Sequence, residues 1–502
     1  MSWLLFTKLK EKLCISAFGC CATDKSVFSR YCDMYKDVLA AESIIGDWML
    51  DERSNLSKSQ IFEHLKRIQR DYPDFIVWDA IISDRRFIFP IKSQLLQNYS
   101  SRFSHYELIR KAVVAFILVE EQVKNLNPNF VFGQTPVTLF DQIYIAICKK
   151  ENIPIYHLSL TRIANYIYFT SNFNGYGKEF SDRFSLFYTN GIDQDLIKTV
   201  KKVVSSSRLG ELQYEGGLSD EVKYKIADQS TTNNTFFRPA VEVLKEISRK
   251  NFWWFGIRRE VRYHPNKFER LFYGVFFRRF RTSCQKKFFK EVIDFDSSYR
   301  YALFALNTEP EIALLNFGKN FRNQIESIRL ISSNLPLDFK LIVKEHPLAI
   351  GYRSAGFYRA IQQFPNVILV GGGLSPGYLI KNCDLVFSIY GTIGLEAIFK
   401  RKPLFCFSKS PYGIFPSSMV RVISDINKFK FEIVAFLEEY SYCEKSTEAY
   451  VGALLSLSCP VNFYSEILGK GKTGGEFCGD LEEQYSRLTS YFLKRLQEDG
   501  HL

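Results

Sequence analysis

The sequence predicts an α/β protein with two Rossmann-like domains and additional helices. A strand, a helix and a second strand follow one another within about 30 residues near residue 130. Between residues 298 and 430, five short apolar runs alternate with helical patterns. Such runs are typical of parallel strands that helices cover on both faces. The 502 residues also suffice for two large domains, at roughly 100–200 residues each.

The first 125 residues have mainly helical patterns. An apolar period predicts a long helix over 105–127, which Asn127-Pro128 ends. A turn at Thr135-Pro136 precedes a further helix through Lys150. Residues 174–235 are polar and predict loops and short helices. Strands are expected in this half at 74–78, 129–133 and 153–158.

The alternation in the second half is clearer. Its strands are expected at 301–306, 339–344, 366–370, 384–389 and 403–407. Its helices are expected at 319–334, 354–364, 375–382 and 392–400. We expect the last helix, over 481–497, to pack back across both domains. The predicted division is an N-terminal α/β domain over 1–235, a basic aromatic connector over 236–297, a Rossmann-like domain over 298–430 and a helical segment over 431–502.

Composition excludes several classes of protein. Hydrophobic residues make up 46% and charged residues 24%, which rules out a disordered or collagen-like chain. The eleven cysteines show neither paired nor zinc-binding spacing, so we expect no metal and a reducing compartment. The N-terminus does not predict a signal peptide, and no apolar run is long enough to span a membrane. We therefore expect a cytoplasmic protein, peripheral on the inner membrane if it contacts lipid.

Most of the formal charge of +12 lies in one segment. Residues 245–290 contain fourteen Lys or Arg and three Glu, a net charge of +11, and thirteen aromatic residues that include Trp253 and Trp254. Helical spacing places Phe268, Phe272 and Phe276 on one face of a helix. Three interpretations compete: an interdomain helical segment, a contact with anionic lipid, and nucleic-acid binding. We expect no nucleic acid, because no nucleic-acid motif accompanies the patch.

Polar or glycine-rich residues follow four successive strands of the second domain. Ligands of open α/β sheets bind beyond the carboxyl ends of the strands, so these positions predict one site. In chain order they are Asn307, Thr308, Glu309 and Glu311; Lys344, Glu345, His346 and Pro347; Gly371, Gly372 and Gly373; and residues 390–397.

The turn over 390–397 predicts a phosphate site. Gly391 and Gly394 allow close backbone approach, and Thr392 is expected to cap the helix that starts there. The free N–H groups of that helix attract an anion. Glu396 lies one turn further and could accept hydrogen bonds from ribose. Taken singly, the turn and the His346-Pro347 pair are ordinary strand-end features, but together they favour a nucleotide.

Two other glycine-containing motifs do not predict a site. Gly471-Lys472-Thr473 resembles the end of a phosphate loop, but Glu466 stands where such a loop has glycine. The triple glycine at 371–373 lacks dinucleotide-binding spacing and predicts a flexible loop that a sugar or base can approach.

The stretches LIVKEHPLAIGYR, NVILVGGG and DLVFSIYGTIGLEAIFKRKPLFCF resemble bacterial capsule polysaccharide biosynthesis proteins. That broad family includes Kdo-linker transferases and is related in outline to sialyltransferases. His346-Pro347 matches one shared mark, and Ser388 with Thr392 matches the other. The resemblance is good over about 298–412, weaker over 128–170, and absent elsewhere.

The resemblance implies a GT-B-like fold, with two Rossmann-like domains facing across a cleft and the donor nucleotide on the second. It implies a glycosyltransferase that moves a sugar from a nucleotide sugar to a surface polysaccharide or lipid-linked acceptor, without a metal. The Kdo-transferring members carry an acidic E-D-G motif in the first domain. Here Glu498-Asp499-Gly500 occurs only at the C-terminus, where we interpret it as a coincidence. The donor type, hexosyl or Kdo/sialyl, therefore stays open, and no catalytic acid is carried over from that motif.

Site residues follow from both lines of argument. His346, with Lys344 and Thr392, is expected to stabilise the leaving phosphate. Asp141 is the candidate base, although a helix-surface role explains it better, and Gln134 and Arg162 are acceptor-side candidates. The expected nucleotide-sugar site comprises Glu309, Lys344, His346, Gly372, Ser388, Gly391, Thr392, Gly394 and Glu396. Two alternatives remain: a nucleotide-sugar 2-epimerase-like enzyme, and a non-catalytic factor of polysaccharide biosynthesis or export.

Overall fold

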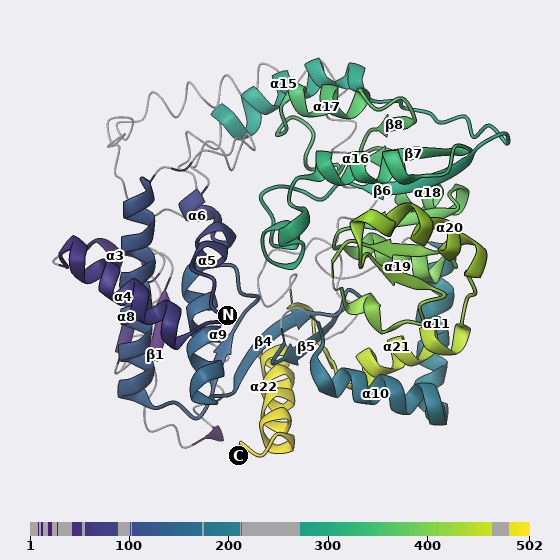
Figure 1. Cartoon of the computed structure of the whole chain (residues 1–502). Helices are drawn as coiled ribbons and strands as arrows, with labels where there is room; N and C mark the ends of the chain where they lie inside the picture. Colours follow the sequence, from purple (N-terminus) through teal and green to yellow (C-terminus); the bar gives the residue numbers. More distant parts are fainter. Residues whose placement is uncertain are drawn as a thin grey trace.

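Figure 1 shows the computed structural model of the chain, in which two α/β halves lie side by side. The longest described segments are 43–52, 56–88, 103–172, 175–210, 272–408, 410–463 and 481–501. Shorter described pieces are residues 9, 12–13, 19–22, 28, 101 and 212.

The second half is built on a parallel sheet of six strands. Its strands are β6 (Arg300–Ala305), β7 (Phe339–Lys344), β8 (Val367–Val370), β9 (Leu385–Ser388), β10 (Leu404–Cys406) and β11 (Val420–Val422). They lie in the order β11-β10-β9-β6-β7-β8, and every pairing is parallel. Numbered along the chain, this is the Rossmann order, with its switch point between β6 and β9. All five predicted strands are present.

Helices cover both faces of this sheet (Figure 1). They are α16 (Gln324–Asn334), α17 (Ala355–Gln362), α18 (Pro376–Asn382), α19 (Thr392–Phe399) and α20 (Phe429–Glu439). Side chains of Asn323, Ser354 and Ser375 accept hydrogen bonds from the first turns of α16, α17 and α18. Successive strand residues point to opposite faces of the sheet and pack in two hydrophobic cores, with Leu303 in one and Phe304 in the other.

The first half combines helices with smaller sheets. Its helices are α3 (Met49–Glu52), α4 (Lys58–Asp71), α5 (Val77–Ser83), α6 (Arg85–Ile88), α8 (His105–Leu126) and α9 (Leu139–Glu151). Strands β1 (Gly19–Ala22) and β2 (Ser43–Gly46) form a parallel pair. Strands β3 (Val131–Gly133) and β4 (Ile155–Leu160) are parallel and flank α9, which confirms the predicted strand–helix–strand unit. Strand β5 (Tyr166–Thr170) is antiparallel to β4.

The chain crosses between the halves twice (Figure 1). Helices α10 (Gly177–Asn190) and α11 (Gln194–Leu209) pack against α21 (Glu444–Ser456), in the core that also contains strand residues of the second half. Near its end the chain returns to the first half. There β12 (Cys459–Pro460) pairs with β5, and α22 (Leu481–Glu498) buries Phe492 against Phe169 and Tyr156.

Two local predictions are wrong. The expected strand over 74–78 is absent: Asp74 lies in a turn, and Val77 and Trp78 begin α5, which buries Ala80 and Ile81. The expected loops and short helices after 174 include helices of 14 and 16 residues. Phe180, Phe184 and Phe187 have the i, i+4, i+7 spacing that indicates a helix.

Only the end of the basic aromatic connector is described. Residues Phe272–Phe277 form a π-helical turn that runs into α15 (Arg278–Gln285), so the helical prediction is confirmed in this part. Trp253, Trp254 and Phe268 lie outside the described residues, as does Gly471-Lys472-Thr473. Among the helices that the structure describes, none is long and apolar enough to cross a membrane.

Candidate active site

The candidate site lies at the switch point of the six-stranded sheet, where the loops after β6 and β9 meet. The side-chain Nδ2 of Asn307 donates to the backbone carbonyl of Tyr390, at 2.6 Å. The backbone N–H of Asn307 donates to Oε1 of Gln324, at 2.7 Å. The first bond fastens the loop after β6 to the loop after β9, and the second fastens it to α16. The predicted convergence of polar strand ends is therefore present in the fold.

The turn after β9 presents the N-terminus of α19. The prediction that Thr392 caps this helix is wrong: Thr392 is its first residue, Gly391 stands at the cap, and no side chain makes the capping bond. The Tyr412 hydroxyl donates to the carbonyl of Gly391 at 2.9 Å and so holds the turn. Because Gly391 offers no side-chain acceptor, the turn suits an anion at the first N–H groups of α19.

Other predicted members of this turn face the interior. A Cβ on Gly394 would lie 2.7 Å from the Tyr412 ring, so this glycine permits helix packing rather than ligand approach. Ser388, at the end of β9, and Glu396, in the middle of α19, are both buried. Both side chains therefore lie beneath the turn over 390–397.

The loop after β7 carries the His-Pro pair. Nδ1 of His346 accepts a hydrogen bond from the backbone N–H of Leu348, at 3.2 Å, which fixes the ring. Lys344 is buried, and its Nζ donates to the carbonyls of Glu345 at 3.3 Å and Gly372 at 3.4 Å. A Cβ on Gly372 would lie 2.6 Å from Cα of Pro347. Lys344 and Gly372 therefore join the loops after β7 and β8.

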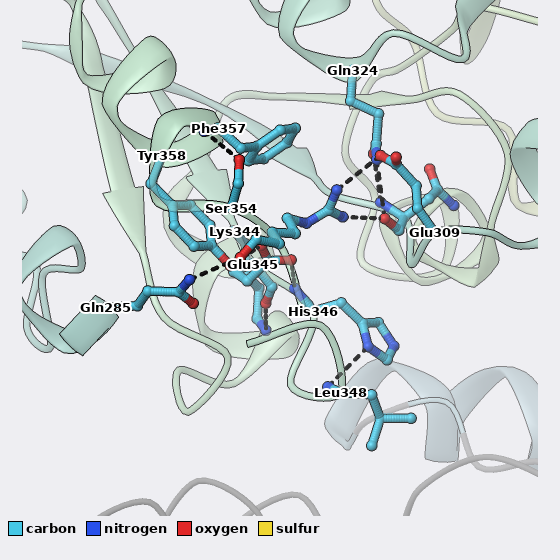
Figure 2. Close-up of polar contacts among 12 residues, drawn as sticks. Gln285, Glu309, Gln324, Lys344, Glu345, His346, Leu348, Ser354, Phe357 and Tyr358 are labelled. Atoms are coloured by element: carbon cyan, nitrogen blue, oxygen red, sulfur yellow. Dashed lines mark hydrogen bonds and ion pairs between the residues drawn. The ribbon is translucent and has the colours of Figure 1, made fainter. Parts of the chain in front are cut away.

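Glu345 is a functional candidate that the sequence argument quoted but did not assign. It is fully buried, and its Oε1 accepts from the backbone N–H of His346 at 2.6 Å. Oε2 accepts from Nε of Arg353 and from the Tyr358 hydroxyl, both at 2.9 Å. Figure 2 shows this carboxylate between the His-Pro loop and α17. The signal that could have found it is a carboxylate directly beside His346 at the end of an apolar strand.

Burial dominates the electrostatics around Glu345. Desolvation raises the pKa of its carboxyl, while the Arg353 guanidinium and the hydrogen bonds from His346 and Tyr358 oppose that rise. Desolvation, reinforced by the Glu345 charge, also raises the pKa of the Tyr358 hydroxyl well above its usual range. Tyr358 is therefore neutral and donates its proton toward the carboxylate.

Glu309 lies close to this network and is partly exposed. Its Oε1 accepts from Nη1 of Arg353 at 2.8 Å and from Nε2 of Gln324. Its side chain is 11% exposed, whereas that of Glu345 is not exposed. Glu309 is thus the acidic side chain that the loop after β6 holds in place beside the His-Pro loop (Figure 2).

A short segment between β6 and α16 joins this site to the first half. It consists of a π-helical turn over Ala313–Phe317 and a 3-10 turn over Lys319–Phe321. Phe317 stacks on Tyr390 with a centroid distance of 4.3 Å. Nδ2 of Asn316 donates to the carbonyl of Pro136 at 2.6 Å, and Lys319 pairs with Asp79. The loop after β3 therefore lies against the edge that carries the candidate site.

The first-half candidates have different surroundings. Asp141 completes the capping box of α9: its Oδ2 accepts from the backbone N–H groups of Val137 and Thr138, at 3.0 and 2.9 Å, and from the Thr138 hydroxyl at 2.8 Å. Gln134 is exposed, and its carbonyl contacts Nδ1 of His157 at 2.9 Å. Gln134 lies on the loop that meets Asn316, whereas Asp141 lies in the first turn of α9 and is engaged in helix capping.

Arg162 lies in the first half, between β4 and β5. Its backbone has a positive φ of 62°, a conformation that residues other than glycine rarely adopt outside functional or tightly held turns. Its guanidinium is close enough to the hydroxyls of Tyr176, Tyr390 and Tyr412 to lower their pKa values, against the larger rise that burial causes. The structure thus brings a predicted acceptor-side residue next to the predicted phosphate turn.

The C-terminal Glu498-Asp499-Gly500 has a structural role. Asp499 accepts from the Tyr156 hydroxyl at 2.7 Å and pairs with Arg495 at 3.2 Å. These contacts tie the end of α22 to β4 and agree with the interpretation of this motif as a coincidence.

The Rossmann strand order places the chain's second half in the class of open, doubly wound α/β proteins, whose ligands bind beyond the carboxyl ends of the strands. Residues 262–415 match the model of the capsule polysaccharide biosynthesis protein family. The match supports, over this segment, the resemblance seen in the sequence. No curated protein matches the chain.

Several solved structures resemble most of the chain weakly. The KpsC β-Kdo 2,7-transferase of Thermosulfurimonas dismutans is 12% identical over 78% of this chain and 98% of its own, with a TM-score of 0.35. The KpsC β-Kdo 2,4-transferase of the same organism is 11% identical over 72% and 87%, also with a TM-score of 0.35. A UDP-GlcNAc 2-epimerase from Neisseria meningitidis, solved with UDP-GlcNAc, is 11% identical over 88% and 98%, with a TM-score of 0.26.

Proposed function

We propose that the protein is a glycosyltransferase of capsule polysaccharide biosynthesis that takes its sugar from a nucleotide-sugar donor. The observation that carries the proposal is the convergence of the His346 loop, Glu309 and the α19 N-terminus at the switch point of a Rossmann sheet. The family match covers this same region of the chain. Capsule synthesis requires transfer of sugars, and this edge of the sheet is where such folds bind nucleotides.

Binding of the donor phosphates would use three cationic or N–H groups. The first N–H groups of α19, around Thr392, face a diphosphate or monophosphate. His346 adds a donor from the neighbouring loop, and Arg162 adds a guanidinium from the first half. Lys344 acts indirectly, because its contacts with Gly372 hold the His-Pro loop in place. Stabilising the departing phosphate in this way lowers the barrier to transfer.

The sugar and ribose would bind on the acidic side of the same edge. Glu309 is the carboxylate best placed to accept a hydroxyl hydrogen bond, since it is partly exposed and held by Arg353 and Gln324. Glu396 lies deeper and would support the ribose from beneath the turn. The acceptor would enter along the loop that carries Gln134, with Asp141 acting there through the helix cap.

The test is a panel of CMP-, UDP- and GDP-sugars, first for a thermal shift of the purified protein and then for turnover with an oligosaccharide acceptor. Stabilisation by one nucleotide class, followed by acceptor-dependent release of that nucleotide, is the expected result. Conversion of the donor without acceptor would instead indicate an epimerase. Binding without any turnover would indicate a non-catalytic member, and no binding at all would reject the nucleotide site.

We further propose that the basic aromatic connector holds the protein at an anionic membrane surface, where lipid-linked acceptors are found. In its described part, α15 exposes Phe280, which is 55% accessible, next to Arg279. Each Lys or Arg near such a surface contributes about 1 kcal/mol, so several contacts give reversible binding.

A further inference from the structure

Arg353 lies in the loop between the His-Pro pair and α17, and its side chain joins two strand-end loops. The guanidinium is buried, with 2% of the side chain exposed. Nε donates to Oε2 of Glu345 at 2.9 Å, and Nη1 donates to Oε1 of Glu309 at 2.8 Å. Nη2 donates to the backbone carbonyl of Asn307. One planar group therefore touches the loop after β7 and the loop after β6 at three points.

The carboxylates of Glu345 and Glu309 link Arg353 to the residues of the proposed donor site. Glu345 also accepts from the backbone N–H of His346, so Arg353 and His346 share one carboxylate. Glu309 is itself a donor-site candidate. Asn307 donates to Tyr390 and so extends the network to the turn before α19. The proposed site requires a fixed spacing between His346, Glu309 and α19. This spacing thus depends on the guanidinium of Arg353.

Helix α15 supports Arg353 from the other side of the loop. Nε2 of Gln285 donates to the backbone carbonyl of Arg353 at 2.8 Å, and Arg281 donates to the same carbonyl. Oε1 of Gln285 accepts from the N–H of Gly351 at 3.1 Å. Gly351 has a φ of 85°, and a Cβ there would lie 2.4 Å from the Thr282 hydroxyl. These contacts therefore hold the main chain at Arg353 in place independently of the contacts of its side chain.

We propose that Arg353 is the positioning residue of the donor site, fixing His346 and Glu309 relative to each other through their shared carboxylate network. This inference rests on the proposed function, because it presumes that these residues bind a nucleotide sugar. A role in folding alone would require only a buried ion pair. The three-point contact to both loops is what a positioning role requires, and only a guanidinium can supply three donors in one plane.

The test is Arg353→Lys, compared with Arg421→Lys. Lysine keeps the charge but loses the planar fork, so we expect nucleotide affinity to fall by about tenfold, which is the size of one lost charged hydrogen bond. Arg421 is the control because it donates to a carboxylate, that of Glu439, and to a carbonyl, that of Glu432, elsewhere in the same half. Arg353→Lys should lose more stability than Arg421→Lys, because the Arg353 side chain is 2% exposed and that of Arg421 is 21% exposed, but only Arg353→Lys should lose nucleotide affinity.

A milder variant keeps the test valid if Arg353→Lys does not fold. Tyr358→Phe removes one of the hydrogen bonds to Glu345 without changing shape, and should weaken nucleotide binding by about threefold to tenfold. The double variant Arg353→Lys with His346→Ala should lose less binding than the sum of the two single losses, because Arg353 acts partly through His346. Fully additive losses would contradict the positioning role.

The outcomes separate this inference from the proposed function. If the wild-type protein binds no CMP-, UDP- or GDP-sugar, the proposed function fails and the Arg353 assignment fails with it. If the wild-type protein binds one of them and Arg353→Lys binds it equally well, the proposed function stands and the Arg353 assignment is overturned.

Discussion

His346 is the single residue on which the proposed chemistry depends most. Removing its contribution to the leaving phosphate should raise the barrier by about 2–4 kcal/mol, which is roughly 10²–10³ in rate. We expect His346→Ala to show this loss in acceptor-dependent nucleotide release, with an unchanged melting temperature. His105→Ala is a suitable control because His105 is exposed on α8. Near-normal turnover of His346→Ala would rule out its phosphate role.

Asp47 makes a prediction about pH, independent of the site. This carboxyl is buried beside Arg86, with Asp84, Asp141 and Cys21 nearby, and burial raises its pKa to about 7. Because this pKa is higher in the folded chain than its usual value near 4, ionisation of Asp47 opposes folding. Stability should therefore fall as the pH rises from about 4 to 7, and stay level above.

Asp47→Asn tests this pH effect. The amide cannot ionise, and Arg86 keeps its ion pair with Asp84. We expect the variant to show a smaller loss of melting temperature between pH 4 and pH 7 than the wild type. Asp74→Asn is the control, since Asp74 is exposed and its ion pair with Lys149 lowers rather than raises its pKa. An unchanged slope for Asp47→Asn would contradict the assignment.

At the scale of elements, α15 has two faces with different roles. Arg278 donates to the carbonyls of Ile350 and Leu348, at 3.1 and 3.0 Å, and Arg281 donates to that of Arg353. These arginines hold the loop behind the His-Pro pair. Replacing them would disturb that loop as well as any lipid contact, so they are unsuitable for testing membrane binding alone.

Phe280 and Arg279 provide the cleaner test of membrane binding. We expect the wild-type protein to sediment with anionic but not neutral liposomes, and to be released at high salt. The variant Arg279→Ser with Phe280→Ser should sediment less while its turnover of a soluble acceptor stays normal. If the wild-type protein does not sediment with anionic liposomes at low salt, the connector does not bind membranes.

The sequence predicted some elements better than others, and the reasons are physical. The strands of the second half were predictable because they are buried on both faces and therefore continuously apolar. The α5 region was mispredicted because its apolar run, Phe75 to Trp78, is short and strand-like, whereas tertiary burial at Ala80 and Ile81 follows a helix. The phenylalanines of α10 recur at helical spacing in the sequence, but the polar residues around them led to the prediction of loops.

The site was predictable in place but not in detail. Strand ends identify the edge where His346, Glu309 and the α19 turn converge, since parallel strands end at the same edge. Side-chain contacts could not be read from the sequence. Gly394 packs on Tyr412, and Asp141 caps α9. Arg353 is nine residues from Lys344 along the chain, and only folding of the loop brings it to Glu345 and Glu309.

At the scale of the whole molecule, the two halves are held together around the candidate site. Helices α10 and α11 pack on the second half, β12 and α22 on the first, and Asn316 contacts Pro136 near the switch point. Arg162, in the first half, is close enough to the Tyr390 hydroxyl to lower its pKa, against the larger rise that burial causes. Arg162→Ala should therefore weaken nucleotide binding about tenfold in isothermal titration, whereas Arg183→Ala, on α10, should leave it unchanged. Equal binding by both variants would mean that the first half contributes nothing to the donor site.

The central claim is that this chain transfers a sugar from a nucleotide donor at the β6–β9 edge. The most direct measurement is the release of free nucleotide from a stabilising nucleotide sugar, with and without an oligosaccharide acceptor, followed by mass spectrometry of the acceptor. We predict acceptor-dependent release and an acceptor heavier by one sugar residue, both lost in His346→Ala. A donor that is bound but never consumed, or is consumed without any change in the acceptor's mass, would contradict the claim.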